Sequence, residues 1–131
     1  MSPKAKHDLK AVSKLLDGGK VAFTARSRST KVIIKLYKET GQIKSEGDAE
    51  RFIVRAIKEL TPAHFFQSVL QWGDPKCVAD VYGLIFDSRP WYVKFLIDEG
   101  VLEQISFHPP EKKFTTTGGI VIPKGDTDYE D

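Results

Sequence analysis

The chain has 131 residues, of which 40% are hydrophobic and 29% charged, a balance that excludes a mostly disordered protein and fits one folded domain. It has no uncharged apolar run near the roughly 20 residues of a membrane helix, and no apolar signal core at its start. A single cysteine excludes an internal disulfide. We therefore expect a soluble, cytoplasmic protein with no membrane partner.

The net charge of +2 is unevenly distributed. Residues 1–38 hold ten basic and two acidic side chains, residues 39–108 hold seven and eleven, and residues 109–131 hold three and five. The basic first third favours a polyanion such as nucleic acid, or an acidic protein partner. The alternative is a solvated helix face rich in lysine.

Apolar residues at helical spacing predict a first helix over residues 8–17. Residues 21–24 indicate a short strand or an extended link. A second, basic helix is predicted over residues 28–38, although its β-branched residues are also compatible with a strand.

A third helix is predicted from Asp48, its expected N-cap, to Leu60, with a continuous apolar stripe between them. Thr61 and Pro62 then resemble a cap and a first-turn proline. They predict a short fourth helix over HFFQSVLQW, residues 64–72.

The hydrophobic period then changes from helical to alternating, which predicts strands over residues 78–86, 91–97 and 101–107. Helices followed by antiparallel strands indicate an α+β fold, with the N-terminal helices packed on a C-terminal twisted antiparallel sheet. We expect one domain over residues 1–108. Residues 109–131 are predicted to be a C-terminal tail, with Ile120–Ile122 as a candidate extra edge strand.

The pairing of the last two strands predicts which side chains share a face. With a three-residue turn at residues 98–100, Ile97 would lie opposite Val101, so even-numbered residues of both strands would face one side. The odd-numbered face is almost entirely apolar and would cover the helices. The even-numbered face would gather polar groups near the open end of the hairpin: Tyr92, Lys94, Gln104, Ser106 and His108.

A phenol, an ammonium and an imidazole on an open sheet suit cleavage of an RNA phosphodiester. That reaction requires a base for the 2′-hydroxyl, an acid for the departing 5′-oxygen and positive charge near the phosphate. His108 suits either proton transfer because a histidine titrates near neutrality. His64 is a second acid–base candidate. The alternative is a solvated polar sheet face without chemistry.

A metal site is not expected, because three histidines at wide spacing and one cysteine make no zinc signature. We therefore predict a site that uses no cofactor.

Four short motifs follow one another over residues 64–108: HFFQSV, VADVY, YVK and SFH. Upstream lies LKAVSKLLDGGKVAFTARS, a helix, a glycine turn and a basic Thr-x-Arg segment. In their order and spacing these stretches resemble the MqsR family of toxin–antitoxin mRNA interferases, over roughly residues 8–108. That family typically carries FYKS, WQDVY, YLK or YVK, and SFK at the corresponding places.

The resemblance implies a RelE-like fold, metal-independent endoribonuclease activity on mRNA, and inhibition by a cognate antitoxin protein. It also implies an active site on the open face of the sheet. The family's tyrosine is kept as Tyr92, whereas its lysines in FYKS and SFK fall on Gln67 and His108 and its glutamine falls on Ala79. These departures predict that the chemistry is either rebuilt around histidine or partly lost.

The candidate catalytic residues are therefore His108, Tyr92, Gln67 and Lys94, and the candidate RNA-binding residues are Arg26, Arg28 and Lys31. The alternative is a non-catalytic RNA-binding or antitoxin-binding module on the same fold. A third interpretation is a protein-binding module whose basic first third contacts an acidic partner.

Overall fold

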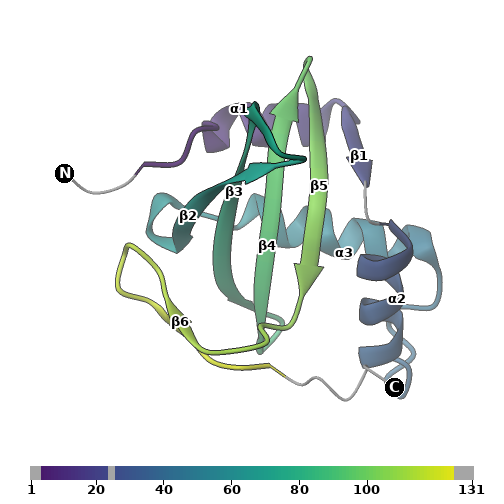
Figure 1. Ribbon diagram of the computed structural model, residues 1–131. Helices are drawn as coiled ribbons and strands as arrows, with labels where there is room; N and C mark the ends of the chain where they lie inside the picture. The colour runs from purple at the N-terminus through teal and green to yellow at the C-terminus, as the bar shows by residue number, and fades with distance from the viewer. Residues whose placement is uncertain (1–3, 24–25, 126–131) are drawn as a thin grey trace.

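The computed structural model describes residues 4–23 and 26–125, without the side chains of residues 26 and 27. Within these residues, three α-helices and a five-stranded sheet form an α+β fold, as predicted. Figure 1 shows α1 and α3 behind the sheet and α2 beside its β1–β5 edge. None of the described helices is long and apolar enough to cross a membrane.

The helices are α1 (Leu9–Asp17), α2 (Arg26–Leu36) and α3 (Glu46–Lys58). The predicted helix over residues 8–17 is confirmed, and the basic segment is a helix rather than a strand. The prediction of Asp48 as the N-cap of α3 is wrong. Ser45 is the N-cap, and its hydroxyl accepts a hydrogen bond from the backbone N–H of Asp48 at 3.1 Å. Asp48 lies in the first helical turn, where its charge suits the helix dipole.

The sheet has the strand order β1-β5-β4-β3-β2. Its strands are β1 (Val21–Phe23), β2 (Phe65–Gln71), β3 (Asp74–Phe86), β4 (Arg89–Asp98) and β5 (Val101–His108). The predicted antiparallel pairing holds for β3 to β5, and β2 also runs antiparallel to β3. β1 runs parallel to β5, so the sheet is mixed. Thr24, the last residue of the predicted first strand, lies outside the described residues.

The predicted fourth helix is wrong. Only Pro62–His64 form a short 3-10 turn, and the chain then enters β2. This strand pairs with β3 from Phe65, opposite Tyr82, to Gln71. Backbone hydrogen bonds to a long neighbouring strand, and the edge-on contact of the Phe65 and Tyr82 rings at 5.5 Å, outweigh the local helical pattern.

The core lies between the helices and one face of the sheet, which we call the helix face. Alternate residues of β4 and β5 near the open end of the hairpin are fully buried there, as the odd-numbered pattern predicted. The ring of Phe52 from α3 meets Trp91 and Phe107 edge-on, at centroid distances of 5.5 and 6.1 Å. The other side of the sheet is called the open face below.

The register of the β4–β5 hairpin differs from the prediction near its turn. Asp98 pairs with Val101, so the turn has two residues, Glu99 and Gly100, both with positive φ (50° and 75°). Such a turn suits the twist of the strands. The register then shifts between Lys94 and Phe95 of β4, where a bulge adds one extra residue to β5.

The bulge restores the predicted parity at the open end, where Lys94 lies opposite Ser106 and Tyr92 opposite His108. Between the turn and the bulge, even-numbered residues of one strand instead lie opposite odd-numbered residues of the other. Gln104 pairs with Phe95, so it lies on the helix face and is fully buried, with both amide atoms lacking a hydrogen-bond partner. The prediction that Gln104 joins the polar group is therefore wrong.

Residues 109–125, which we call the strap, fold back over the open face (Figure 1). β6 (Phe114–Thr115) and β7 (Val121–Ile122) pair with each other, so the predicted strand near residues 120–122 exists but does not extend the main sheet. Thr117 donates its backbone N–H to the Phe65 carbonyl at 2.7 Å, and Ile122 is fully buried. Residues 126–131 of the predicted tail lie outside the described residues.

Candidate active site

The polar side chains of the open face follow two cross-strand rows. In the first row, Gln67 lies opposite Val81, which lies opposite Lys94, which lies opposite Ser106. In the second row, Gly83 pairs with Tyr92, which pairs with His108. Directly opposite residues share a face at Cα separations of about 4.5–5.5 Å, so polar side chains from the three strands β2, β4 and β5 converge.

A bulge in β2 adds one further side chain to this surface. Phe66 and Gln67 are neighbours in sequence and would point to opposite faces of a regular strand. The pairing of β2 with β3 shifts between Phe65 and Gln67, and both Phe66 and Gln67 line the same pocket. The bulge therefore places an aromatic ring beside the polar rows.

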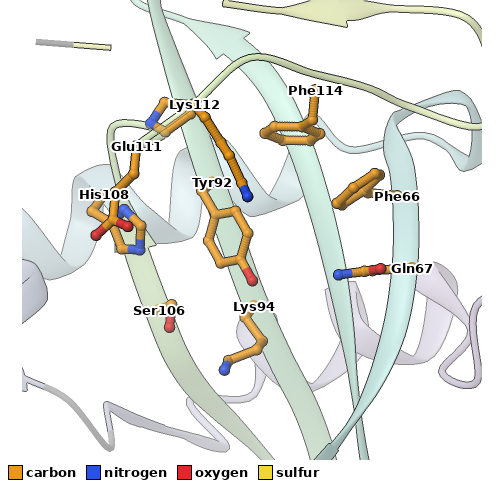
Figure 2. Close-up of a pocket in the computed structure, with 10 residues that line it drawn as sticks. Phe66, Gln67, Tyr92, Lys94, Ser106, His108, Glu111, Lys112 and Phe114 are labelled. Carbon is orange, nitrogen blue, oxygen red and sulfur yellow. The ribbon is translucent and has the colours of Figure 1, made fainter. Parts of the chain in front are cut away.

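The rows and the strap line a pocket of about 370 Å³ that is open to solvent (Figure 2). Its lining includes all four predicted catalytic residues, Gln67, Tyr92, Lys94 and His108, together with Phe66, Ser106, Pro110, Glu111, Lys112 and Phe114. The open-face location expected from alternation thus coincides with a pocket built from both sheet and strap.

His108 is held in a defined orientation. Its Nδ1 lies 2.8 Å from the backbone carbonyl of Pro109, and its ring stacks on Tyr92 with centroids 5.0 Å apart and planes 16° apart. A carbonyl oxygen only accepts hydrogen bonds, so Nδ1 carries the proton and donates it. In the neutral imidazole the unshared pair is then on Nε2, which is the nitrogen able to act as a base.

Tyr92 stands at the centre of the pocket, and its hydroxyl points between the side chains of Gln67 and Lys94 (Figure 2). Burial, and to a smaller extent the negative charge of Glu111, raise the pKa of Tyr92 above its ordinary value. The phenol therefore stays protonated at neutral pH and is available as a hydrogen-bond donor to an anionic ligand.

Lys94 is half-buried beside Tyr92, and this burial lowers its pKa below the usual range. Desolvation disfavours the ammonium form, which makes Lys94 a readier proton donor than a lysine in water. An incoming phosphate would reverse part of that penalty by supplying the missing negative charge.

The pocket residues that the sequence did not predict are Phe66 from β2 and four residues of the strap, Pro110, Glu111, Lys112 and Phe114. The sequence held one signal for the strap. A glycine inside a strand often marks the close approach of another segment, and Gly83 is such a residue. A Cβ atom at Gly83 would lie 2.4 Å from the ring of Phe114 and 2.8 Å from Ile122.

The predicted RNA-binding residues lie elsewhere. Arg28 and Lys31 are exposed on α2, and Lys31 lines a separate groove with Lys35 and Lys38. The side chain of Arg26 lies outside the described part of the chain. None of the α2 side chains that the structure describes lines the pocket.

Two other residues considered in the sequence analysis, His64 and Ala79, make structural contacts outside the pocket. His64 accepts a hydrogen bond on Nδ1 from the Thr61 backbone N–H at 2.9 Å, and burial lowers its pKa. Ala79 packs with Leu96 and Ile105 in a small apolar cluster near the hairpin turn. Neither residue lines the pocket.

No protein-family model matches this chain, and no curated protein sequence matches it either.

Proposed function

We propose that the protein is the toxin of a toxin–antitoxin system and a metal-independent endoribonuclease that cleaves mRNA, on a fold of the RelE-like type. The observation that carries the proposal is the convergence of Gln67, Tyr92, Lys94 and His108 in one solvent-open pocket. The resemblance to MqsR-family motifs selects RNA as the substrate of this pocket.

The proposed reaction uses the 2′-hydroxyl of RNA as the nucleophile. Nε2 of His108 takes the proton from this hydroxyl, because Nδ1 is already bound to the Pro109 carbonyl. The 2′-oxygen attacks phosphorus, the bond between phosphorus and the 5′-oxygen breaks, and the leaving oxygen is protonated. The products are a 2′,3′-cyclic phosphate and a 5′-hydroxyl.

Lys94 and Tyr92 serve the phosphate in this mechanism. The ammonium of Lys94 offsets the charge that develops on the phosphoryl oxygens and supplies the proton to the 5′-oxygen, for which its lowered pKa is suited. The protonated phenol of Tyr92 and the amide of Gln67 donate hydrogen bonds to the same oxygens. No step requires a metal ion.

The presence of both His108 and Lys94 in the pocket would compensate for the departure from the family pattern. The family's lysine in FYKS is replaced here by Gln67, a neutral donor, and its lysine in SFK by His108. The pocket keeps Lys94 and gains an imidazole, which can donate or accept a proton, so it retains the positive charge and the proton transfer that the reaction needs.

Arg28 and Lys31 are assigned to a second role. They lie on an exposed basic helix outside the pocket, where they suit phosphates of the flanking RNA or an acidic segment of the cognate antitoxin.

The test is cleavage of RNA oligomers of varied sequence in EDTA. Each is paired with an oligomer of the same sequence that carries a single 2′-deoxy nucleotide at the cleaved position. The proposal predicts cleavage of the RNA, a cyclic phosphate at the new end, and no cleavage at the 2′-deoxy position. Cleavage that persists there would contradict 2′-hydroxyl attack.

Binding without cleavage would favour the alternative, a non-catalytic RNA-binding or antitoxin-binding module. In that case RNA affinity would fall steeply with salt while no products form. An absence of any salt-dependent RNA affinity would instead favour the protein-binding interpretation.

A further inference from the structure

We propose that Phe66 and Phe114 form a base-stacking subsite, so that the strap selects the nucleotide that lies next to the scissile phosphate. This inference rests on the proposed function for its choice of ligand. Neither phenylalanine is one of the four predicted catalytic residues: Phe66 lies in β2, and Phe114 lies on the strap, after the last motif of the family resemblance.

The two rings form a built aromatic wall. Their centroids are 4.5 Å apart with an angle of 41° between planes, and the ring of Tyr92 meets Phe114 edge-on at 6.2 Å. Both phenylalanines are half-buried and line the pocket. In Figure 2 they lie at the end of the pocket opposite His108, with Tyr92 between. A base on this wall would therefore belong to a nucleotide beside the reacting phosphate.

The charges around the wall favour a nucleobase over an uncharged apolar ligand. Lys94 rises from the sheet on one side, and Lys112 extends from the strap toward Tyr92 (Figure 2). Flat aromatic rings beside cations are the combination by which proteins bind single-stranded nucleic acid, with the rings stacking on bases and the cations meeting phosphates.

The strap is anchored independently of the aromatic wall. The hydroxyl of Thr116 donates to the Ala63 carbonyl at 2.7 Å, that of Thr117 donates to the Phe65 carbonyl at 2.9 Å, and Ile122 is fully buried. Gly125 donates its backbone N–H to the Pro110 carbonyl at 2.9 Å and closes the strap on itself. The ring of Phe114 is therefore presented by a fixed segment.

The test uses RNA oligomers that are 2′-O-methylated throughout, which cannot be cleaved by 2′-hydroxyl attack, so binding is measured separately from chemistry. Phe114→Leu keeps an apolar side chain but removes the stacking surface. We expect its affinity for such oligomers to fall by about 5- to 150-fold, the range for loss of one stacked base. Trp72→Leu is the matched control, because Trp72 is an exposed aromatic at the β2–β3 turn and does not line the pocket.

An abasic oligomer identifies the contact. It lacks the base next to the scissile position, so the wild-type protein should bind it more weakly than it binds the complete oligomer. Phe114→Leu should bind the abasic and the complete oligomer with equal affinity. Phe66→Leu, on the other side of the wall, should give the same result and serves if Phe114→Leu does not fold. Unchanged affinity in the leucine variants, or equal losses with and without the base, would overturn the inference.

The outcome is separable from that of the proposed function. Base-dependent binding by a protein that never cleaves RNA would retain the subsite and overturn the nuclease. Cleavage in which the leucine variants keep both the affinity and the cleavage sites of the parent would retain the nuclease and overturn the subsite. A wild-type protein that binds none of the oligomers overturns the inference.

Discussion

The two faces of the sheet are built from alternating residues of the same strands, yet around the pocket they differ in burial and in polarity. On the helix face Trp91, Phe95 and Phe107 are fully buried among the side chains of the helices. On the open face Tyr92 and His108 are half-buried and meet solvent in a pocket. The comparison indicates that the helix face supplies most of the core and that the open face carries the candidate chemistry, so polar side chains of the pocket can be changed with little loss of stability.

The largest expected difference in stability between the two faces is at two adjacent residues, Trp91 and Tyr92. Trp91 donates its indole N–H to the Phe86 carbonyl at 2.9 Å and stacks on Phe107 at 4.7 Å. Trp91→Ala should lower the free energy of unfolding by about 3–5 kcal/mol, the usual cost of emptying such a core site. Urea denaturation measures it.

Tyr92→Phe is the matched change on the open face. It keeps the ring that stacks on His108 and removes only the hydroxyl, so we expect a stability change below about 1 kcal/mol together with slower RNA cleavage. Equal destabilisation by Trp91→Ala and Tyr92→Phe would contradict the division between the faces.

The next largest effect concerns the contact between strap and sheet. Gly83→Ala would place a methyl group 2.4 Å from the ring of Phe114, and overpacking of this kind costs about 1–3 kcal/mol. We also expect faster amide hydrogen exchange at residues 114–122, measured by mass spectrometry. Gly18→Ala is the control, because its added atom would meet nothing closer than 3.5 Å. Unchanged exchange in the strap of Gly83→Ala would show that the strap does not depend on this contact.

Two glutamines test the difference between the faces through an expected gain of stability rather than a loss. Gln104 is fully buried on the helix face and neither amide atom has a hydrogen-bond partner. Gln104→Leu should therefore raise the free energy of unfolding by about 1–2 kcal/mol, because the desolvation cost of the amide is removed.

Gln67→Leu provides the counterpart on the open face, where the side chain is exposed. It should leave stability nearly unchanged and slow RNA cleavage. Thermal unfolding and a cleavage assay on both variants check the pair. A loss of stability in Gln104→Leu would mean that the buried amide contributes to the fold.

The smallest expected effect is a pH dependence of stability from Lys94. Its pKa is lower in the folded protein than in the unfolded chain, so between these two values the unfolded state binds more protons. Stability from this group therefore increases as pH rises through the folded pKa, and the increase is complete near the unfolded value of about 10.4.

Lys94→Met removes this dependence and isolates it from the opposite contribution of Tyr92. Because the pKa of Tyr92 is raised, this phenol makes stability fall above its unfolded pKa of about 10. Chemical denaturation of the parent and of Lys94→Met at pH 8 and pH 10 gives the difference. A variant with the same pH profile as the parent would contradict the assignment.

The strands around the site were predictable because their alternation is strong, but their register was not. The predicted three-residue turn was wrong by one residue, and the bulge beside Lys94 then compensated that error at the open end. Tyr92, Lys94 and His108 therefore lie together as predicted, whereas Gln104, before the bulge, faces the core. A bulge depends on tertiary packing, so local pattern does not locate it.

The segment from Phe65 to Gln71 and the strap show a second limit. The first follows a cap-like Thr61-Pro62 pair and has helical spacing, but pairing with β3 makes it a strand. The strap has little periodicity, and its place is set by the space above Gly83 and by side-chain hydrogen bonds to residues about 50 positions away, such as Thr117 to Phe65. Such long-range contacts are hard to predict from the local sequence pattern, and the glycine within β3 is the main indication of them.

The most direct test of the account compares two histidines. His108→Ala and His64→Ala each remove one imidazole, but only His108 lines the pocket, whereas His64 caps the short turn before β2. The measurement is the single-turnover rate of RNA cleavage in EDTA for the parent and both variants. We predict a fall of about 10²-fold or more for His108→Ala, and a rate near that of the parent for His64→Ala. Equal rates for His108→Ala and the parent would contradict the assignment of His108 and the site built around it.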